Sequence, residues 1–405
     1  WKIAQSPDCG KIFFAPGNGG TASIRSASGQ ISENVDISVS DINGLADFAE
    51  KNADFTVVGP ELPLSLGIAD AFRERALRVF GPDRRSARLE TSKAYAKAFM
   101  RKYDIPTAAY SAFDEVEAAL AALPSQKFPL WVKADGLAAG KGAVFCPDEE
   151  TAYKTVVSMM MREIFGAAGM RVVLEEHMEG RELTLLCLTD GETILPMDSA
   201  RDYKRALDGD EGLNTGGMGS ISPVPGFGGL TEEIKRIMEN SLRGIQGERL
   251  DYRGVLYIGL MLTREGPKVV EYNARFGDPE TQALLPRLDS DLLKALCAVN
   301  ARKLSEINLR WKTETAVCVV AAAGGYPEQY ATGQPIAFAG ESASADAAVF
   351  HAGTRGDGNK TVTAGGRVLA VTALGSDTET AREKAYKALE GIHFQDIHYR
   401  KDIGL

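Results

Sequence analysis

Three side chains with complementary chemistry alternate in the stretch V-V-E-Y-N-A-R-F-G-D-P-E-T-Q, residues 269–282. Glu271, Asn273 and Arg275 occupy every second position, and a β-strand places such positions on one face. A carboxylate and an amide oxygen suit Mg²⁺, which binds few protein oxygens and completes its shell with water and phosphate. A guanidinium beside them matches a phosphate fork. The pattern predicts a metal and phosphate site, although a half-buried strand with polar residues facing solvent explains the three residues alone equally well.

A second stretch combines glycines with lysines. An apolar strand is predicted at 129–134, and its Lys133 is followed by D-G-L-A-A-G-K-G-A-V at 135–144. This pattern predicts a hairpin whose small, basic tip closes over phosphate. It is not a Walker A loop, because Gly142 stands where Ser or Thr is required and no helix follows. A plain β-turn is the alternative, and two lysines among so many glycines favour the phosphate flap.

Two polar segments follow this hairpin. The predicted strand at 171–175 runs into E-H-M-E-G-R-E, whose backbone is suited to an adenine edge, with a carboxylate beyond it for ribose hydroxyls. Residues 198–219 are predicted to form a long polar loop that ends in N-T-G-G-M-G. Such loops in compact regions are usually functional or disordered, and the mixed charges around Lys204 favour function.

The N-terminal part of the chain has the pattern of a small domain that would position these segments. Strands predicted at 11–15, 55–58 and 77–80 alternate with helices and end in glycine turns. This order predicts a small parallel sheet with ligands at its carboxyl edge. The first turn, P-G-N-G-G-T at 16–21, has enough glycine for its backbone N–H groups to face an anion.

Two further regions complete the predicted architecture. A helix begins near Ser92 and carries Lys93 and Lys97. Charged helix faces are usually solvated, and this is the expectation for Lys97. After residue 311, predicted strands and a closing helix at 378–391 are typical of a separate small α+β unit.

The composition argues against several classes of protein. The chain has 405 residues, which is enough for about two to four packed units. A net charge of −9 and a pI near 5.2 argue against nucleic acids and acidic membranes, which need a basic face. The longest nearly apolar run, 316–323, is too short to span a bilayer. Five scattered cysteines fit a reducing cytoplasm, and four histidines leave little for His-dependent nucleophilic catalysis.

Taken together, the motifs resemble a known family. Lys93 and the segments K-A-D-G-L-A-A-G-K-G, L-E-E-H-M-E-G-R-E-L and E-Y-N-A-R resemble the nucleotide site of the ATP-grasp superfamily. More narrowly, five further segments resemble those of the phosphoribosylamine–glycine ligase family. They are P-G-N-G-G-T-A, D-Y-K-R-A-L-D-G-D-E-G-L-N-T-G-G-M-G, R-F-G-D-P-E-T-Q, H-A-G-T and T-A-G-G-R-V-L. This match runs essentially from end to end.

The resemblance implies a multidomain α/β and α+β fold. An N-terminal Rossmann-like parallel α/β domain is expected at 1–88, and a C-terminal α+β domain at 309–405. Between them, an ATP-grasp domain is expected at 89–308, with a mobile lid at about 107–176. The family's initial strand and G-x-G-G-R-E-H-A loop are not in this chain, so the first domain is expected to lack its first strand and the acceptor site to be incomplete as given.

The resemblance also implies a reaction in two steps. The glycine carboxylate attacks the γ-phosphate of ATP, giving glycyl phosphate and ADP, and the amine of 5-phosphoribosylamine then displaces phosphate. The product is glycinamide ribonucleotide, an intermediate of de novo purine synthesis. No protein nucleophile is needed, which agrees with the few histidines. We also expect the reaction to use Mg²⁺ or Mn²⁺ and only small-molecule substrates, with no nucleic acid or membrane partner. The enzyme is expected to be a cytoplasmic monomer.

Individual roles follow from the same resemblance. The expected ATP-binding residues are Lys93, Lys133, Gly136, Gly140, Lys141, Gly142, Glu175, Glu176, Met178 and Glu182. The expected metal ligands are Glu271 and Asn273, and the expected catalytic residues are Arg275, Lys204 and Asp278. The expected substrate-binding residues are Asn18, Gly19, Gly20, Thr21, Asn214, Thr215, Gly216, Gly217, Gly277 and Pro279. Residues 18–21 and Lys204 are expected to face phosphoribosylamine. Residues 277–279 and the loop at 214–219 are expected to hold glycine and the acyl phosphate.

Two departures from the family pattern change these expectations. Tyr203 stands where many relatives have His, so a proton-transfer role there is not expected. Leu260 and Leu262 stand where many ATP-grasp enzymes supply a metal carboxylate. The remaining metal coordination is therefore expected to come from phosphate and water.

Three alternatives stay open on the sequence. Another ATP-grasp enzyme, such as a carboxylase that uses bicarbonate, leaves the glycine-site motif unexplained. A regulatory nucleotide-binding module does not need Glu271 and Asn273. A dinucleotide-dependent oxidoreductase is expected to show G-x-G-x-x-G, which is not visible.

Overall fold

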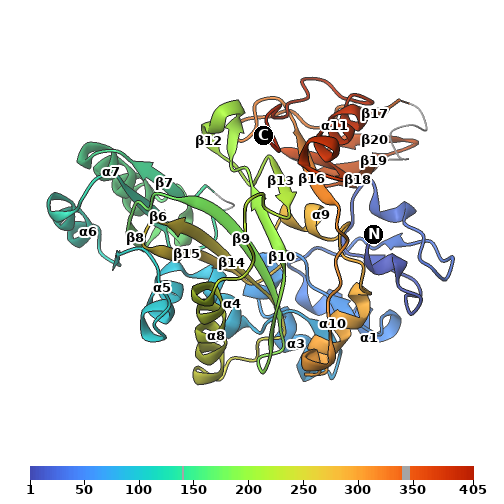
Figure 1. Cartoon of the computed structure of the whole chain (residues 1–405), viewed down its shortest axis with the longest axis horizontal. Helices are drawn as coiled ribbons and strands as arrows, with labels where there is room; N and C mark the ends of the chain where they lie inside the picture. The colour runs from blue at the N-terminus through green and yellow to red at the C-terminus, as the bar shows by residue number, and fades with distance from the viewer. Residues whose placement is uncertain (139–140, 340–346) are drawn as a thin grey trace.

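The computed structural model describes residues 1–138, 141–339 and 347–405 (Figure 1). The N-terminal region contains two pairs of parallel strands, β1 (Phe13–Phe14) with β2 (Glu33–Asn34) and β3 (Thr56–Val57) with β4 (Val79–Phe80). Its helices are α1 (Ile42–Asn52), α2 (Glu61–Ser65), α3 (Ile68–Glu74) and α4 (Arg84–Thr91), with 3-10 turns η1 (Ile3–Gln5) and η2 (Thr21–Ser23). The parallel pairing and the alternation with helices are confirmed, but the strands form two separate pairs instead of one sheet, and each predicted strand is shorter than expected.

A lid projects from one side of the molecule (Figure 1). It contains a four-stranded antiparallel sheet in the order β5-β8-β6-β7. The strands are β5 (Tyr110–Phe113), β6 (Leu130–Ala134), β7 (Ala143–Cys146) and β8 (Val172–Glu176), and the helical segments are α6 (Val116–Ala122), η3 (Leu123–Ser125), α7 (Glu149–Val156), η4 (Val157–Met161) and η5 (Gly166–Gly169). Leu130 and Val132 pack in a buried cluster that includes Val156 of α7. Because strand side chains alternate, Lys133 points to the opposite face of this sheet.

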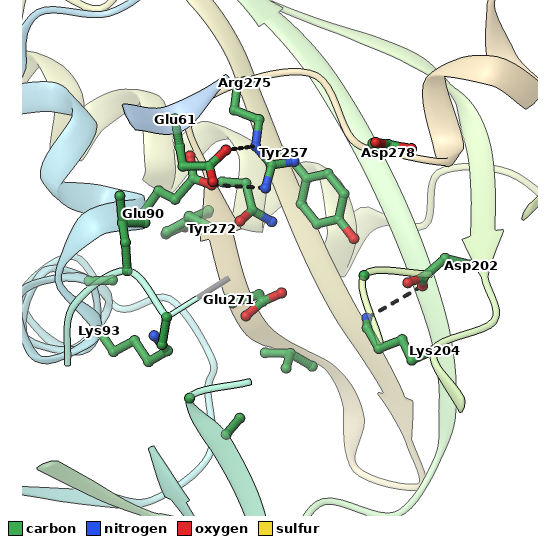
Figure 2. A pocket seen from close by; sticks show the side chains of 18 of the residues that line it. Glu61, Glu90, Lys93, Asp202, Lys204, Tyr257, Glu271, Tyr272, Arg275 and Asp278 are labelled. Atoms are coloured by element: carbon green, nitrogen blue, oxygen red, sulfur yellow. Dashed lines mark hydrogen bonds and ion pairs between the residues drawn. The ribbon is translucent and has the colours of Figure 1, made fainter. Parts of the chain in front are cut away.

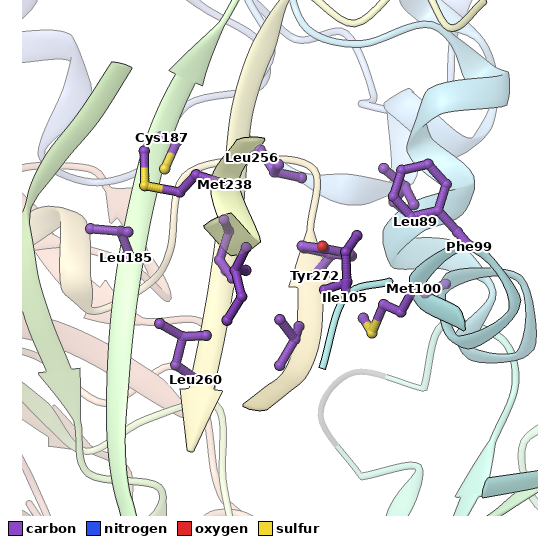
Figure 3. Close-up of a cluster of buried hydrophobic side chains, with 14 of the residues drawn as sticks. Leu89, Phe99, Met100, Ile105, Leu185, Cys187, Met238, Leu256, Leu260 and Tyr272 are labelled. Carbon is purple, nitrogen blue, oxygen red and sulfur yellow. The ribbon is translucent and has the colours of Figure 1, made fainter. Parts of the chain in front are cut away.

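The central element is an eight-stranded sheet in the order β15-β14-β9-β10-β13-β16-β21-β18. Its first five strands are β9 (Arg181–Thr189), β10 (Ile194–Asp202), β13 (Gly219–Ser222), β14 (Gly254–Thr263) and β15 (Gly266–Asn273). The helical segments around this half are α5 (Lys93–Lys102), α8 (Glu232–Gly247), α9 (Glu280–Leu284), α10 (Leu292–Asn300) and η7 (Leu304–Glu306). One face packs against α5 and α8 through a large apolar cluster that includes Leu256, Leu260 and Tyr272 (Figure 3).

The C-terminal region continues this sheet. β13 pairs with β16 (Thr315–Ala322), which pairs with β21 (Arg367–Gly375) and through it with β18 (Ala347–His351). The other elements are β17 (Ala337–Phe338), β19 (Thr354–Asp357), β20 (Lys360–Thr363), α11 (Thr378–Leu389) and β22 (Ile392–His393). The predicted α+β unit is therefore present, but it is not separate in hydrogen bonding from the central sheet.

Helix starts follow from local side-chain chemistry. Seven helices begin after a residue whose side chain accepts a hydrogen bond from a backbone N–H of the first turn, as N-caps do. These residues are Asp41, Asp83, Ser92, Asp148, Thr231, Asp291 and Asp377.

The segment 198–219 differs from its prediction as one long polar loop. It contains the end of β10, a short hairpin of β11 (Arg205–Leu207) and β12 (Glu211–Asn214) joined by η6 (Asp208–Asp210), and the start of β13. These strands are too polar and too rich in glycine to show the alternation that predicts a strand. None of the helices in the described ranges is long and apolar enough to cross a membrane.

Candidate active site

A cavity of about 600 Å³ lies where the N-terminal region, the lid, the central sheet and the C-terminal region meet. Many predicted site residues line it: Lys93, Lys133, Gly142, Glu175, Lys204, Asn214, Thr215, Gly216, Glu271, Asn273, Arg275 and Asp278. Others are not part of its lining: Asn18, Gly19, Gly20, Thr21, Gly136, Lys141, Glu176, Met178, Glu182, Gly217, Gly277 and Pro279. Gly140 lies outside the described residues.

The strand β15 presents its alternate polar residues to this cavity. Glu271 and Asn273 line the cavity. Tyr272 and Ala274 pack in the apolar cluster, although part of Tyr272 also borders the cavity. Burial alone raises the pKa of Glu271, but Lys204, Lys133, Lys93 and Arg275 outweigh it, and the net pKa is lowered. The carboxylate is therefore ionised at neutral pH, as a metal ligand must be.

The neighbouring strand adds no second carboxylate beside Glu271. Gly259 of β14 pairs with Glu271, and Leu260 is buried in the core. Within the described ranges, no cluster of three or more His, Cys, Asp or Glu residues could hold a metal by itself. The source of the remaining metal coordination therefore stays a prediction.

Arg275 is held by two carboxylates from the N-terminal side (Figure 2). Its Nη2 lies 3.0 Å from Oε1 of Glu90, and its Nε lies 3.4 Å from Oε2 of Glu61. Glu90 also accepts a hydrogen bond of 2.8 Å from the backbone N–H of Ala274. Burial raises the pKa of Glu90 to about 6, since it outweighs the attraction of Arg275. Neither carboxylate was predicted, because each joins Arg275 only through the fold.

The lysines of the site share one buried carboxylate. Glu175 Oε1 lies 2.8 Å from Nζ of Lys133, and its Oε2 lies 3.0 Å from Nζ of Lys97. Lys97 also donates to the Thr107 hydroxyl at 2.7 Å, and only 3% of this lysine is exposed. The expectation of a solvated Lys97 is therefore wrong. Its helix face packs against the lid, where Glu175 neutralises its charge.

Hydrogen bonds join the start of the glycine-rich flap, residues 135–136, to the start of α5. Asp135 accepts hydrogen bonds from the Ser92 hydroxyl at 3.0 Å and from the Ala94 backbone N–H at 2.7 Å. Lys93 then reaches the carbonyl oxygen of Gly136 at 3.4 Å. Burial lowers the pKa of Lys93, which Glu271 partly offsets.

The connector after β8 has a polar backbone beside partly buried side chains. Glu176 accepts from the Ala109 N–H at 3.2 Å, and His177 Nδ1 lies 3.1 Å from the indole nitrogen of Trp131. Met178 is buried. Glu182 lies 3.3 Å from Lys204, so this carboxylate and the loop of Lys204 face each other.

Lys204 stands beside a carboxylate of the same charged segment, to which the sequence analysis assigned no role. Its Nζ lies 3.4 Å from Oδ1 of Asp202, which also lines the cavity (Figure 2). Burial raises the pKa of Asp202 to about 7 although Lys204 opposes the shift. Burial lowers the pKa of Lys204, but Asp202 and Glu182 outweigh it and the net pKa is raised.

The C-terminal region contributes two further residues that were not predicted. Arg367 Nη1 donates to the carbonyl oxygens of Gly216 at 2.9 Å and Asp278 at 3.0 Å, and its Nη2 lies 3.0 Å from Oδ2 of Asp278. The Tyr326 hydroxyl accepts from the Gly216 N–H at 3.0 Å. Arg367 lies in the G-G-R-V-L segment, which was recognised only as a family motif.

The glycine-rich turn at 18–21 uses its own amides. The N–H groups of Gly20 and Thr21 donate to the side chain of Asn18 at 2.9 and 3.1 Å, and that of Asn18 donates to the Thr21 hydroxyl at 2.7 Å. The N–H of Gly19 donates to the Thr354 carbonyl at 3.2 Å. The expectation of free N–H groups facing an anion is therefore wrong, because the Asn18 side chain and β19 satisfy them.

Tyr203 points away from the cavity into the C-terminal core. The guanidinium carbons of Arg201 and Arg400 lie 4.6 and 5.1 Å from the centre of its ring. Its hydroxyl accepts from the Gly404 N–H at 3.0 Å. These contacts give Tyr203 a structural role in the C-terminal region.

Domain models of one family match the chain in order. They describe the phosphoribosylglycinamide synthetase N domain at residues 1–90, its ATP-grasp (A) domain at 91–281 and its C domain at 316–405. The chain belongs to the phosphoribosylglycinamide synthetase family. The predicted three-part architecture and the resemblance are both confirmed.

Two bacterial relatives match throughout this synthetase chain. The phosphoribosylamine–glycine ligase of Pseudomonas aeruginosa is 46% identical over 410 residues, covering 100% of this chain and 94% of that protein. That of Allochromatium vinosum is 48% identical over 411 residues, with the same coverage. The activity of this chain is accordingly that of a phosphoribosylamine–glycine ligase, an ATP-grasp enzyme of de novo purine biosynthesis.

Solved structures agree with this family assignment. The phosphoribosylamine–glycine ligase of Thermotoga maritima superposes with a TM-score of 0.84 at 32% identity, covering 100% of this chain and 96% of that one. A biotin carboxylase domain from Hydrogenobacter thermophilus has a TM-score of 0.72 at 16% identity, covering 96% of this chain and 91% of that one. The second likeness shows the fold alone, so it does not support the carboxylase alternative.

Proposed function

We propose that the cavity binds ATP beneath the lid and joins glycine to 5-phosphoribosylamine through glycyl phosphate. The observation that carries this proposal is the row of alternate polar residues at the end of β15 and just beyond it, where Glu271, Asn273 and Arg275 line one cavity with Lys93 and Lys133. A carboxylate is a poor acyl donor because its leaving group would be oxide. Phosphorylation by ATP gives it a stabilised leaving group, and the site then has only to position the reactants and neutralise charge.

The first step would depend on the cations around β15. Lys93 and Lys133 would bind ATP phosphates, with the flap that includes Gly136, Lys141 and Gly142 closing over them. Arg275 would steady the transferred phosphoryl group through donors that Glu61 and Glu90 keep in place. These groups act in a buried site, where fixed charges stabilise developing charge more strongly than in water.

We assign the base and the ribose to the connector after β8. The backbone from Glu175 to Met178, including Glu176, would read the adenine edge, and Glu182 would bind ribose hydroxyls. The side chain of Glu175 is already held by Lys133 and Lys97. Its role toward ATP would therefore include holding Lys133 in position.

The donor set of β15 fits Mg²⁺ or Mn²⁺. Glu271 and Asn273 would supply hard oxygens, and water and phosphate would complete the shell. The bound ion would supply charge neutralisation for the phosphates. The biotin carboxylase domain from Hydrogenobacter thermophilus, which shares this fold, was solved in complex with MgADP, and this favours Mg²⁺ here.

The second step would take place at the C-terminal side of the cavity. Asp278 and the loop with Asn214, Thr215, Gly216 and Gly217 would hold glycine and its acyl phosphate, together with Gly277 and Pro279. Lys204 and the turn with Asn18, Gly19, Gly20 and Thr21 would face phosphoribosylamine.

The wider expectations belong to the same proposal. The domains would divide at 88/89 and 308/309, with the lid at about 107–176. The protein would act as a monomer on small molecules in the cytoplasm, where five free cysteines stay reduced.

The testing experiment measures ADP release from ATP and Mg²⁺, with glycine and freshly generated phosphoribosylamine each omitted in turn. Glycine labelled with ¹⁸O in its carboxyl group reports the path of oxygen. We expect ADP release to require both substrates and one label to appear in phosphate. ADP release without label in phosphate would rule out glycyl phosphate.

A further inference from the structure

A buried carboxylate at the start of α9 lines the cavity without a cationic partner. Glu280 is 3% exposed, and its Oε1 accepts hydrogen bonds from the Tyr257 hydroxyl at 2.8 Å and the Thr184 hydroxyl at 3.3 Å. Among the described residues, no lysine, arginine or histidine lies within 4.0 Å of either oxygen, and Oε2 has no hydrogen bond. A buried charge in this state is unfavourable until a cation reaches it.

The other carboxylates around this cavity already have roles or partners. Arg275 binds Glu61 and Glu90, two lysines hold Glu175, Lys204 lies beside Asp202, and Arg367 binds Asp278. Glu271 faces the phosphate lysines as the assigned metal ligand. Glu280 is therefore the carboxylate best placed to take a cation that arrives with substrate.

The surroundings of Glu280 keep its second oxygen accessible. A Cβ atom added at Gly277 would lie 2.7 Å from Oε2, so a side chain there would displace the carboxylate. A Cβ atom at Gly217 would collide with the Pro279 ring. Figure 2 shows the Tyr257 hydroxyl directed toward the side of the cavity that holds Asp202 and Lys204. Glu280 therefore lines the cavity with an oxygen that no side chain at position 277 covers, which leaves room for a small ligand.

We propose that Glu280 accepts the ammonium group of glycine and is the residue that makes the site specific for an amino acid. The inference rests on the placement of glycine beside residues 277–279 in the proposed function. ATP and phosphoribosylamine carry no ammonium group beside a carboxylate, whereas glycine does. Its carboxylate can then point to the γ-phosphate while its ammonium stays on Glu280.

This placement has a chemical consequence for the second step. An amine is a nucleophile only when it is neutral, and an ion pair with a carboxylate favours its protonated form. Glycine held on Glu280 stays protonated and does not acylate itself once glycyl phosphate has formed. The neutral amine of phosphoribosylamine is then the nucleophile: its nitrogen bonds to the carbonyl carbon, the C–O bond to the phosphoryl group breaks, and inorganic phosphate leaves as the amine loses a proton. Glu280 forms no covalent bond in this scheme.

The experiment compares Glu280→Gln with the wild-type enzyme in steady-state ADP release with freshly generated phosphoribosylamine. Gln keeps the size and the acceptor for Tyr257 but removes the charge. We expect the KM for glycine to rise on the order of 10- to 100-fold, with the KM for ATP within about threefold. Acetate, which lacks the ammonium group, should show an unchanged kcat/KM, so the preference for glycine over acetate falls by the same factor.

Asp202→Asn serves as the matched variant, because this carboxylate lines the same cavity but already has a cationic partner in Lys204. Loss of the preference for glycine in Asp202→Asn while Glu280→Gln keeps it would overturn the proposal. An equal rise in the KM for glycine and in the KM for ATP in Glu280→Gln would also overturn it, since that result indicates a structural role.

A second variant covers the case in which Glu280→Gln does not fold. Tyr257→Phe keeps the charge of Glu280 and removes only its orienting hydroxyl, and we expect a smaller rise, about three- to tenfold, in the glycine KM alone. No selective rise would contradict the proposal. If the wild-type enzyme itself releases no ADP in response to glycine, the proposed function fails, which is a different result from a failure of Glu280.

Discussion

The buried lysine on α5 shows how one side chain acts through another. Lys97 pairs with Glu175, and Glu175 in turn holds Lys133, which faces the phosphate site. Burial lowers the pKa of Lys97, and Glu175 partly restores it. Removing one partner of such a pair leaves the other charge buried and only partly compensated.

We therefore expect Lys97→Met to lower the free energy of unfolding by about 2–3 kcal/mol and to weaken ATP binding, because Lys133 loses its fixed position. Chemical denaturation and titration calorimetry with ATP check the two effects. Lys102→Met is the control on the same helix, since 63% of the Lys102 side chain is exposed. Similar ATP affinity in both variants would contradict a positioning role for Lys97.

A pH effect is expected at Glu90, whose burial raises its pKa to about 6 from the ordinary 4.5. The folded state then binds this proton more tightly than the unfolded state, so the contribution of Glu90 to stability falls as pH rises from about 4.5 to 6. A shift of this size corresponds to roughly 2 kcal/mol. Unfolding measured between pH 4.5 and 7 should show the wild-type protein losing stability relative to Glu90→Gln over this range. A constant difference would show that Glu90 does not titrate there.

At the scale of elements, the hairpin that follows Lys204 is fastened by the end of the chain. Arg400 is 1% exposed and lies 2.7 Å from Oδ1 of Asp210 and 2.6 Å from Oδ2 of Asp402. Asp402 accepts from the Gly209 N–H at 2.9 Å. At the base of the same hairpin, the Thr215 N–H donates to the Lys204 carbonyl at 2.8 Å. The contacts of Arg400 with Asp210 and Asp402, called the clasp below, therefore hold the hairpin that carries these two cavity residues.

We expect Arg400→Met to destabilise the protein by about 2–4 kcal/mol and to raise the KM for glycine and phosphoribosylamine, with ATP affinity nearly unchanged. The reason is that the hairpin carries Lys204 and Thr215, whereas the phosphate lysines lie on other elements. Steady-state kinetics with each substrate varied in turn measure the split. Arg400→Lys should recover part of the loss, and Lys401→Met, an exposed neighbour, should have no effect. An equal loss of affinity for ATP would contradict a local role for the clasp.

The sequence predicted the elements whose signals are local. The alternation of Glu271, Asn273 and Arg275, the cap at Ser92 and the apolar strand β16 are each visible within a few residues, and the structure contains them all. Partners that the fold brings together were not visible: Glu90 for Arg275, Glu175 for Lys97 and Asp278 for Arg367. Such pairs are distant in sequence, so no spacing rule indicates them.

At the scale of the whole molecule, the continuous sheet places the C-terminal region at the active site. β13 joins β16, and the adjoining β21 begins with Arg367, which reaches across to Gly216 and Asp278. The C-terminal region is therefore part of the glycine side of the cavity and not an appended unit.

We expect Arg367→Met to raise the KM for glycine by about tenfold or more and to leave the affinity for ATP within about threefold, because two carbonyl oxygens and one carboxylate lose a charged donor far from the phosphate lysines. Arg367→Lys keeps the charge but not the fork, so an intermediate value is expected. Arg355→Met, an exposed position in the same region, serves as the control. Kinetics with glycine varied at saturating ATP decide the point. If Arg367→Met matched its control, the C-terminal region would contribute stability to the sheet and nothing to the binding of glycine.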